Sequence, residues 1–467
     1  MSSYNIKEFG AQGNGTIKDT RAIQCALDTC TQNGGGTVLV PAGIYLCGTL
    51  YLHDNTTLHL DSGATIQGSP NLADYNPDDA YPQNAFCKEE NWTGAHLLIA
   101  LEAHHVALTG TGTIDGNSAA FLEPSRSGLP EFTIKDRRPG QMICFVECTH
   151  VTIRDVSLNR APSWTLFLHG CEACSLSGIR IFNPRGTPTG DGLDIDCCRD
   201  VTVSNCIIRS SDDSITLRGN NARLKNSDRP CENVVISNCL LSSDTCGIRV
   251  GVGDGLIRNC QVDNCILTDC RTGIHMISSY AANFTGGDKK GCSIEHIAFS
   301  NLTITAKIPI WILSGESRTA TIRDISFSHL RIFARMGGFI AGALPGLISD
   351  LHFTEINLDF AEPDLGLLPD DHITSNLREW DLLEARLPYG LYLLNLNRVS
   401  FHHFALRLAT GPANPLIPIQ TNACQAITFN HLSLETPSSI SPEQAIQYRN
   451  GSSPKMTDSY LNDRPLI

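Results

Sequence analysis

The sequence has no cluster of basic residues and no long apolar run. Its 467 residues include 35 Lys and Arg against 48 Asp and Glu, so the formal net charge is −13 with histidine neutral. Without a block of Lys and Arg, a nucleic-acid partner is not expected. No apolar stretch approaches the length that spans a membrane. An anionic sugar is still allowed, because a few local arginines are enough to bind one.

The first residues, Met-Ser-Ser-Tyr-Asn-Ile-Lys-Glu-Phe-Gly, also lack the charged and apolar regions of an export signal. We therefore expect a cytoplasmic protein with reduced thiols. The 19 cysteines show no pairs at zinc-ribbon spacing. Several lie inside strand-like runs, where we expect them to pack as small hydrophobic side chains. No metal and no cofactor is expected.

A loosely repeated strand runs through most of the chain. The copies are rich in β-branched residues, which favours strands; they cover 151–158, 174–181, 201–208, 234–241, 260–267, 292–299, 320–327, 348–358, 399–408 and 426–434. Asn205, Asn238 and Asn264 recur at the same place in their copies. Such a repeat predicts an all-β solenoid with parallel sheets, in which these asparagines form a ladder at a corner.

The two ends of the chain do not follow the pattern of the strand repeats. Asp19 is a candidate N-cap for a helix that Gly34 ends, and this helix is expected to cap the solenoid within an N-terminal cap of about residues 1–36. From residue 437 the sequence is rich in Ser and Pro and then polar. We predict a single domain over 1–436 and an irregular arm over 437–467.

Three carboxylates stand out in the middle of the chain. Asp191 lies 21 residues before Asp212, and Asp213 follows directly. One coil of a solenoid over that interval would bring them to adjacent rungs of one face. Like charges at short range push one pKa up, so one group can donate a proton, and paired carboxylates are what glycoside hydrolysis requires. We expect Asp194 to support Asp191, and Asp196 to be solvated.

These motifs resemble those of the family 28 glycoside hydrolases, the polygalacturonases and rhamnogalacturonases. The most specific match joins Gly190-Asp-Gly-Leu-Asp-Ile-Asp196 to Asp212-Asp213, and further matches lie at 9–15, 34–45, 110–117, 138–139 and 161–164. The resemblance implies a right-handed parallel β-helix and an inverting hydrolase. In that mechanism Asp212 protonates the leaving oxygen, while Asp191 and Asp213 hold and activate water. Inversion needs the carboxyl groups about 6.5–9.5 Å apart.

Two family motifs are altered here. We place the family's Gly-His-Gly on residues 244–246, which puts Thr245 where the family has its histidine. The family's Arg-Ile-Lys falls on 275–277, so His275 and Ile277 replace the two cations that hold the substrate carboxylate. The loss of a charge-assisted hydrogen bond, about 1.5–3 kcal/mol, favours a neutral sugar such as rhamnose at this position.

Other side chains are candidates for contacts with the sugar. Arg218, Arg249 and Arg271 are the cations that could compensate for those lost, and Trp164 could stack on a sugar ring. Insertions at 121–137, 220–230 and 279–290 could wall off one end of a cleft and enforce exo cleavage of short oligosaccharides. An oligosaccharide is the only partner that the sequence indicates.

Two other functions remain open at this point. Parallel β-helix lyases hold calcium with aspartates, and here Asp191, Asp212 and Asp213 could hold the ion with Arg249 as the base. A non-catalytic carbohydrate-binding β-helix is also possible, because the family's His, Arg and Lys are missing.

Overall fold

The computed structural model describes residues 2–77, 94–125, 131–278, 291–315, 317–360, 363–364, 387–409, 417–436 and 440–466. Its contacts divide the chain into two compact units. The first unit holds Met1–Asp244 with Phe284–Gly286, and the second holds Thr245–Asn283 with Gly287–Ile467. The single domain expected over 1–436 stays a prediction.

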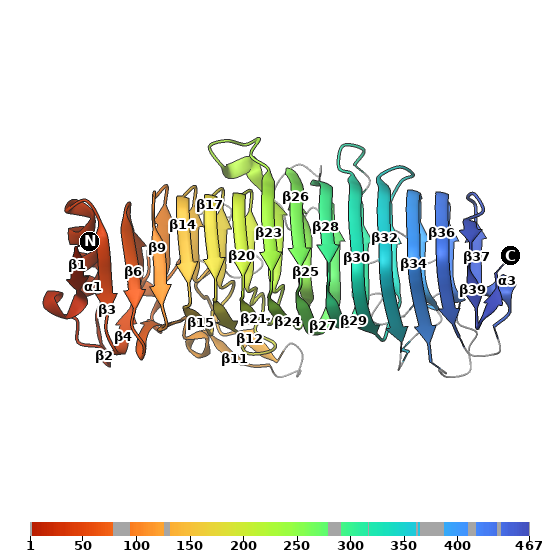
Figure 1. The fold of residues 1–467 in the computed structure, drawn as a ribbon. Coiled ribbons are helices and arrows are strands. Elements are labelled where there is room, and N and C mark those ends of the chain that lie inside the picture. The colour runs from red at the N-terminus through yellow and green to blue at the C-terminus, as the bar shows by residue number, and fades with distance from the viewer. Residues whose placement is uncertain are drawn as a thin grey trace. The chain divides into compact units, whose positions relative to one another are not determined.

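The first unit is built from coils of short parallel strands (Figure 1). Its strands are β1 (Ser3–Asn5), β2 (Asn14–Lys18), β3 (Gly36–Val40), β4 (Gly43–Cys47), β5 (Leu50–Leu52), β6 (Thr56–Leu60), β7 (Ala64–Gly68), β8 (Leu98–Leu101), β9 (Ala107–Gly110), β10 (Thr113–Asp115), β11 (Leu122–Pro124), β12 (Phe132–Ile134), β13 (Ile143–Val146), β14 (Thr149–Arg154), β15 (Ser157–Asn159), β16 (Leu166–His169), β17 (Glu172–Ser177), β18 (Arg180–Phe182), β19 (Leu193–Asp196), β20 (Arg199–Ser204), β21 (Ile207–Ser210), β22 (Ile215–Gly219), β23 (Cys231–Ser237) and β24 (Leu240–Ser243). Short 3-10 turns lie at η1 (Ile6–Phe9), η2 (Leu72–Asp74), η5 (Ser118–Ala120) and η6 (Asn221–Arg223).

Equivalent strands of successive coils pair in parallel and in register. β16 pairs with β19 and β19 with β22, while β17, β20 and β23 form a second ladder and β18, β21 and β24 a third. Leu176, Val203 and Ile236 stack at one position of the second ladder and are fully buried. Because side chains alternate along a strand, the apolar half of each strand fills the bore and the other half faces outward. The predicted all-β, right-handed parallel β-helix is confirmed.

The predicted N-terminal helix is α1 (Thr20–Gln32). Its face of Ile23, Ala26, Leu27 and Cys30 is buried, as its apolar spacing predicts. The side chain of Asp19 makes no capping bond to the helix. It accepts hydrogen bonds from the backbone N–H groups of Gln12 and Gly13 instead, at 2.6 and 2.9 Å. The expectation that Asp19 caps the helix is corrected: its carboxylate closes the preceding turn.

The second unit has longer strands that bend at the corners of the coil. They are β25 (Cys246–Gly253), β26 (Leu256–Asp263), β27 (Ile266–Ile277), β28 (Ser293–Ser300), β29 (Thr303–Leu313), β30 (Ile322–Ala334), β31 (Gly338–Ala341), β32 (Ile348–Phe360), β33 (Tyr389–Leu394), β34 (Leu396–Leu408), β35 (Ile417–Asn422), β36 (Gln425–Glu435), β37 (Ile446–Arg449), β38 (Lys455–Thr457), β39 (Tyr460–Leu461) and β40 (Arg464–Pro465). A stack of Phe299, Phe327, Phe353, Phe401 and Phe429 runs through its bore.

The tail differs from the irregular arm expected from residue 437. A short helix, α3 (Pro442–Ala445), leads into β37, which pairs in parallel with β35. β38 and β39 then pair with β36. The composition did not predict these strands, because they are stabilised by backbone hydrogen bonds to the last coil. Most of their side chains are exposed or half-buried.

The corner asparagines adopt the conformation that their places require. Asn205, Asn238 and Asn264 have φ values of 57°, 55° and 51°. Asn tolerates this left-handed region better than most residues. Repetition of one turn residue in successive copies is therefore a consequence of backbone geometry.

The cysteines behave as predicted among the described residues. All 18 of them are free thiols, and every one except Cys25 is buried. Burial raises the pKa of the Cys292 thiol to about 12 and that of Cys424 to about 11. These thiols are packing groups at neutral pH. None of the described helices is long and apolar enough to cross a membrane.

Candidate active site

The three aspartates of the first unit lie on neighbouring rungs, as their spacing predicts. Asp191 precedes β19, and Asp212 and Asp213 precede β22. The N–H groups of Gly192 and Leu193 donate to the carbonyls of Asp213 and Ser214 at 2.8 and 3.0 Å. These bonds extend the register of β19 and β22 toward the turn, so Asp191 stands opposite Asp213.

Two glycines allow this close approach. A Cβ on Gly192 would lie 2.5 Å from the carbonyl oxygen of Ser214, and one on Gly190 would lie 2.2 Å from the Ser211 hydroxyl. At Gly192 any side chain would displace the backbone of the neighbouring rung, whereas at Gly190 it would displace the Ser211 side chain. Gly192 therefore allows the rung of Asp191 to lie against that of Asp213.

The carboxyl groups differ in their exposure. Asp191 and Asp213 are 4% and 1% exposed, whereas Asp212 is half-buried. Burial raises the pKa of Asp191 well above its ordinary value, and the charges of Asp194, Asp212 and Asp213 raise it further. The group of carboxyls therefore retains a proton at a pH where a solvated aspartate has lost it.

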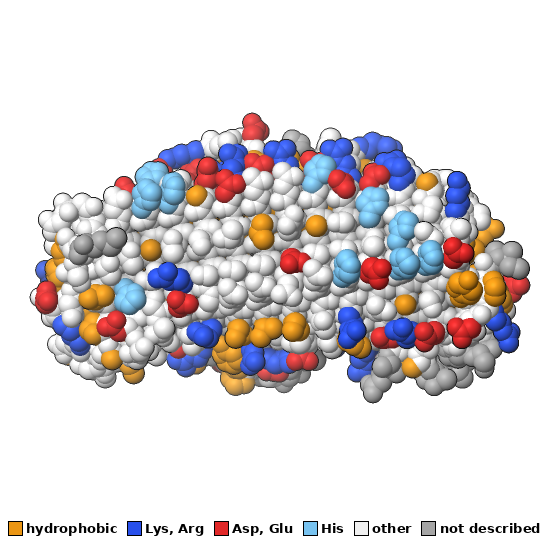
Figure 2. Space-filling view, viewed as in Figure 1, with side chains coloured by type: hydrophobic (Ala, Val, Ile, Leu, Met, Phe, Trp, Pro, Cys, Tyr) orange, Lys and Arg blue, Asp and Glu red, His pale blue; other side chains and the backbone are white. Residues whose placement is uncertain are grey.

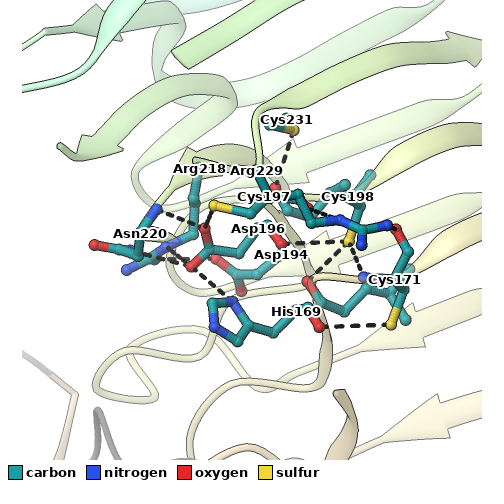
Figure 3. Close-up of polar contacts among 12 residues, drawn as sticks. His169, Cys171, Asp194, Asp196, Cys197, Cys198, Arg218, Asn220, Arg229 and Cys231 are labelled. Carbon is teal, nitrogen blue, oxygen red and sulfur yellow. Dashed lines mark hydrogen bonds and ion pairs between the residues drawn. The ribbon is translucent and has the colours of Figure 1, made fainter. Parts of the chain in front are cut away.

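A buried polar network lies beside these aspartates (Figure 3). Asp194 and Asp196 share one face of β19, and both are fully buried. Nη1 of Arg218 lies 3.2 Å from Asp194, and its Nε lies 3.8 Å from Asp196. The Asp196 carboxylate also accepts hydrogen bonds from the backbone and side chain of Asn220 and lies 3.5 Å from His169. The expectation that Asp196 is solvated is therefore wrong.

The same network shifts the pKa values of Asp194 and Asp196 in opposite directions. Burial raises the pKa of Asp194 to about 7, even though Arg218 opposes the shift. Burial alone would also raise the pKa of Asp196, but His169, Arg218 and the Asn220 N–H outweigh it and keep that pKa below its ordinary value. Asp194 is thus the proton-holding member of the pair, and Asp196 is the permanent anion.

Arg218 is turned toward this network. Its guanidinium lies over the Trp164 ring at 4.4 Å, and only 7% of the residue is exposed. Trp164 itself is 8% exposed and meets Phe167 edge-on at 5.5 Å. The ring stacks with an arginine, and this arginine balances two buried carboxylates. That Arg218 and Trp164 bind the sugar stays a prediction.

A second buried arginine holds the segment before Asp191. Arg138 is 1% exposed, and its Nη1 donates to the carbonyls of Pro162 and Pro188 at 2.7 and 2.6 Å. Its Nη2 donates to the Thr189 hydroxyl at 2.6 Å. Thr189 has a φ of 45°, two residues before Asp191. Arg138 was noted in the sequence only as part of a motif; the structure gives it a positioning role.

The other candidate residues belong to the second unit. Arg249 and His275 are register partners of β25 and β27, and His275 is the partner of Trp311 on β29. His275 is 3% exposed, with its ring centroid 5.6 Å from that of Trp311. Thr245, Arg249 and Arg271 are half-buried, and the Thr245 carbonyl accepts a bond from the Thr272 N–H at 2.8 Å.

Cys246 contacts one of these candidate residues. Its Sγ lies 3.1 Å from Nδ1 of His275, and both side chains are almost fully buried. The sequence did not single out Cys246. That Thr245 takes the place of the family's histidine stays a prediction.

Within the described parts of the chain, no group of three or more His, Cys, Asp or Glu side chains is arranged to hold a metal ion. Of the five aspartates at 191–196 and 212–213, Asp194 and Asp196 lie against Arg218.

Sequence comparison places this site among known proteins. The model of glycosyl hydrolases family 28 matches residues 30–332. An exo-poly-alpha-D-galacturonosidase of Dickeya chrysanthemi is 26% identical over 350 residues, which cover 65% of this chain and 56% of that protein. A probable polygalacturonase of Vitis vinifera is 26% identical over 46% of this chain and 44% of its own length. The chain thus spans about half the length of these two curated relatives.

Solved structures agree on the fold. A family 28 exopolygalacturonase of Yersinia enterocolitica superposes with a TM-score of 0.63 at 15% identity, over 98% of this chain and 78% of that one. A polygalacturonase from Erwinia carotovora gives a TM-score of 0.60 at 18% identity, over 78% of this chain and 94% of that one. With the family model matching well over half of its residues, this chain belongs to glycosyl hydrolases family 28.

Proposed function

We propose that this chain is an inverting glycosidase that cleaves pectin-derived oligosaccharides of the galacturonate or rhamnogalacturonan type. The observation that carries the proposal is the placement of Asp191 opposite Asp213 on the next rung, with Asp212 beside Asp213. Two or more carboxyls that share protons at one site supply both an acid and a base.

The carboxyls divide the reaction between them. Asp212, the half-buried member, gives its proton to the glycosidic oxygen as the bond from that oxygen to the anomeric carbon breaks. Asp191 and Asp213 hold a water molecule, and the ionised carboxylate of the two takes one proton from it as the water oxygen bonds to the anomeric carbon. Arg218 and Asp194 lie behind these groups, where their ion pair sets the electrostatic environment of the three carboxyls.

We propose that the sugar bound at the altered motifs is neutral at its contact with Ile277. The environment of His275 contains a thiol and the Trp311 ring, and Ile277 is 6% exposed within an apolar cluster. An isoleucine cannot pair with a carboxylate, so a uronic acid would lose a charge-assisted bond there. Arg249, the register partner of His275, and Arg271, on the same strand as His275, are cations of this part of the second unit that could favour galacturonate.

The mode of attack is proposed to be exo cleavage. The curated relative from Dickeya chrysanthemi is named for exo action. In this chain the insertion at 121–137 forms an antiparallel hairpin of β11 and β12. A third insertion, 279–290, lies outside the described residues.

A product assay tests the proposal. Oligogalacturonides and rhamnogalacturonan oligosaccharides with defined non-reducing ends are incubated with wild type and with Asp212→Asn. Released sugars are identified by chromatography, and ultraviolet absorbance reports any unsaturated product. We expect a saturated monosaccharide whose release falls about 10²–10⁴-fold in Asp212→Asn.

The matched control is Asp155→Asn, which removes an exposed carboxylate of the same unit. It should release sugar at the wild-type rate. An unsaturated product that disappears with a chelator would establish a lyase instead. Binding of the oligosaccharides without any release, equal in wild type and Asp212→Asn, would establish a binding protein.

A further inference from the structure

The outer sheet of the second unit carries a group of exposed histidines, which we call the histidine face. It consists of His296 on β28, His329 on β30, His352 on β32, His402 and His403 on β34, and His431 on β36. All six are exposed. Figure 2 shows these imidazoles gathered over the strands labelled β28 to β36 in Figure 1.

Backbone geometry accounts for four of the six. His296, His329, His403 and His431 have φ values between 49° and 57°, and histidine is among the residues enriched in this region. It does not account for His352 and His402, which occupy ordinary strand positions on the outward side. Contacts fix the orientation of several of these rings. The rings of His403 and His431 stack at 4.5 Å, and Nδ1 of His352 lies 2.9 Å from the Ser400 hydroxyl.

The charged neighbours of these histidines nearly balance. Among the described charged residues around these histidines, the cations are Arg258, Arg323, Arg331, Arg398 and Lys455, and the carboxylates are Asp263, Glu295, Asp324, Asp350, Glu355 and Asp458. Arg323 pairs with Glu295, and Arg398 pairs with Asp350. Asp324 lies 2.5 Å from His296, and Asp458 lies 3.8 Å from His431. Past the corner, Arg407 bridges Asp359 and Glu435.

Protonation of the histidines therefore reverses the sign of this surface. With neutral imidazoles the six carboxylates outnumber the five cations, and six imidazolium groups would leave an excess of positive charge. Histidine is the side chain that ordinarily changes charge between about pH 5 and 8. His402 and His403 have no carboxylate as a hydrogen-bond partner among the contacts described, so their charge would be available to a ligand. His352 bonds to the Ser400 hydroxyl and interacts electrostatically with Asp350, which Arg398 already pairs.

We propose that the histidine face binds a carboxylate-bearing polysaccharide chain at mildly acidic pH and releases it near neutral pH. A polyuronate stays ionised at that pH, because free carboxyl groups titrate near pH 4. A flat sheet with cations on several successive rungs, spaced about 4.8 Å apart, presents a row of charges to a linear polyanion. The choice of a polyuronate rests on the proposed function, whereas the reversal of charge does not.

The charge of the whole chain makes such a surface useful. With a net charge of −13, the protein repels a polyanionic chain. A local surface that becomes cationic would hold the polymer at the protein when the surroundings are acidic. None of its residues belongs to the carboxylate group of the first unit, so the surface can be altered without changing that group.

Binding to immobilised polygalacturonate tests the proposal. The Asp212→Asn protein is used so that the polymer stays intact, and dissociation constants are measured at about pH 5.5 and about pH 7.5 in low salt. We expect binding at least about tenfold tighter at the lower pH, and loss of the difference in about 0.5 M salt. Equal affinity at the two pH values would overturn the proposal.

A matched pair of triple variants locates the surface. His352→Gln, His402→Gln and His403→Asn remove three imidazoles of the face, with Asn chosen for the left-handed position. His104→Gln, His105→Asn and His150→Asn remove three exposed imidazoles of the first unit, where His105 and His150 stack at 4.4 Å. The first variant should lose most of the pH dependence, and the second should keep it.

The outcomes separate this surface from the active site. Loss of pH dependence in the control variant alone, or equally in both variants, would overturn the assignment to the histidine face. Binding that depends on pH as expected, in a protein that cleaves no pectic oligosaccharide, would support the surface while the proposed hydrolase fails. Cleavage without pH-dependent binding would retain the hydrolase and remove the surface.

Discussion

The Sγ of Cys246 lies 3.1 Å from Nδ1 of His275. Both side chains are almost fully buried, 1% and 3% exposed, and the His275 ring packs beside Trp311. A buried imidazole needs a partner for each ring nitrogen that faces the protein, because an unsatisfied polar atom in the interior costs free energy. The thiol is thus one of the groups that fix the orientation of the His275 ring.

Removal of that thiol should destabilise the protein. Cys246→Val keeps the volume but takes away a polar contact of the buried His275, so we expect the free energy of unfolding to fall by about 1–3 kcal/mol. Cys246→Ser, which keeps a hydroxyl in reach of the ring, should recover most of the loss. Urea unfolding followed by circular dichroism measures both variants.

The control for this prediction is Cys424→Val in the same unit. Cys424 is 1% exposed, and its thiol donates to the backbone carbonyls of Leu393 and Asn422. Loss of these weak bonds should cost less than about 1 kcal/mol. If Cys246→Val and Cys424→Val were equally stable, the contact with His275 would have no special importance.

Asp194 and Asp196 should influence stability in opposite directions as the pH changes. The pKa of Asp194 is raised from 3.8 to about 7 in the folded protein. The folded chain keeps this proton where the unfolded chain has lost it, so the contribution of Asp194 to stability falls as the pH rises from about 4 to about 7. The pKa of Asp196 is lowered, so its contribution is present above about pH 4 and is lost as the pH falls further.

Two isosteric variants separate these effects. Asp194→Asn should reduce the decline in the free energy of unfolding between about pH 4 and pH 7, because residue 194 no longer gains a charge there. Asp191, whose pKa is also raised, should keep part of the decline. Asp196→Asn should lower stability most at neutral pH, by about 3–5 kcal/mol, since it removes the anion that pairs with Arg218 and His169. Unfolding curves at a series of pH values test this pair. The same pH profile in both variants would contradict the assignment.

Arg138 should matter for both stability and turnover. Arg138→Met leaves the carbonyls of Pro162 and Pro188 and the Thr189 hydroxyl without their charged donor. Hydrogen bonds to charged groups contribute about 1.5–3 kcal/mol each, so a loss of about 3 kcal/mol or more is expected. Because the Asp191 segment loosens, kcat should fall more than KM changes.

Two comparisons make this result specific. Arg138→Lys keeps the charge but not the planar fork, so it should restore only part of the loss. Arg154→Met removes an exposed arginine of the first unit that lies 3.4 Å from Asp155, and it should change stability by less than about 0.5 kcal/mol. A kcat of Arg138→Met at the wild-type value, in a protein that still folds, would show that Arg138 supports the fold alone.

The repeats and the carboxylates could be predicted because each is fixed by local chemistry. A left-handed corner selects Asn205 and Asn238, and burial of alternate side chains selects Val203 and its stack. Once the repeat is recognised, the spacing of Asp191 from Asp213 places them one coil apart. Parallel register then brings them together without further information.

Other features depend on partners that are distant in the sequence. The burial of Asp196 follows from Arg218 and Asn220, 22 and 24 residues later, although its position two residues from Asp194 already put both on one face. The tail strands depend on backbone hydrogen bonds to β35 and β36. No pattern of side chains in the sequence predicts these bonds. The thiol of Cys246 gained its role only through its contact with His275 on the next coil.

The stereochemistry of the first product tests the arrangement of the carboxyls directly. Asp191 and Asp213 face each other across one rung spacing, and Asp212 stands beside Asp213 at the more exposed edge. An acid and a base on opposite sides of the glycosidic bond leave room for a water molecule, and attack by that water inverts the anomeric carbon. From an α-linked oligogalacturonide or rhamnogalacturonan fragment, the sugar released first should therefore be the β anomer. Proton NMR within the first minutes, before mutarotation, distinguishes the two anomers, and a sample left to equilibrate serves as the control. An α anomer formed first would require a covalent intermediate and carboxyl groups only about 5–5.5 Å apart, in conflict with the inverting mechanism.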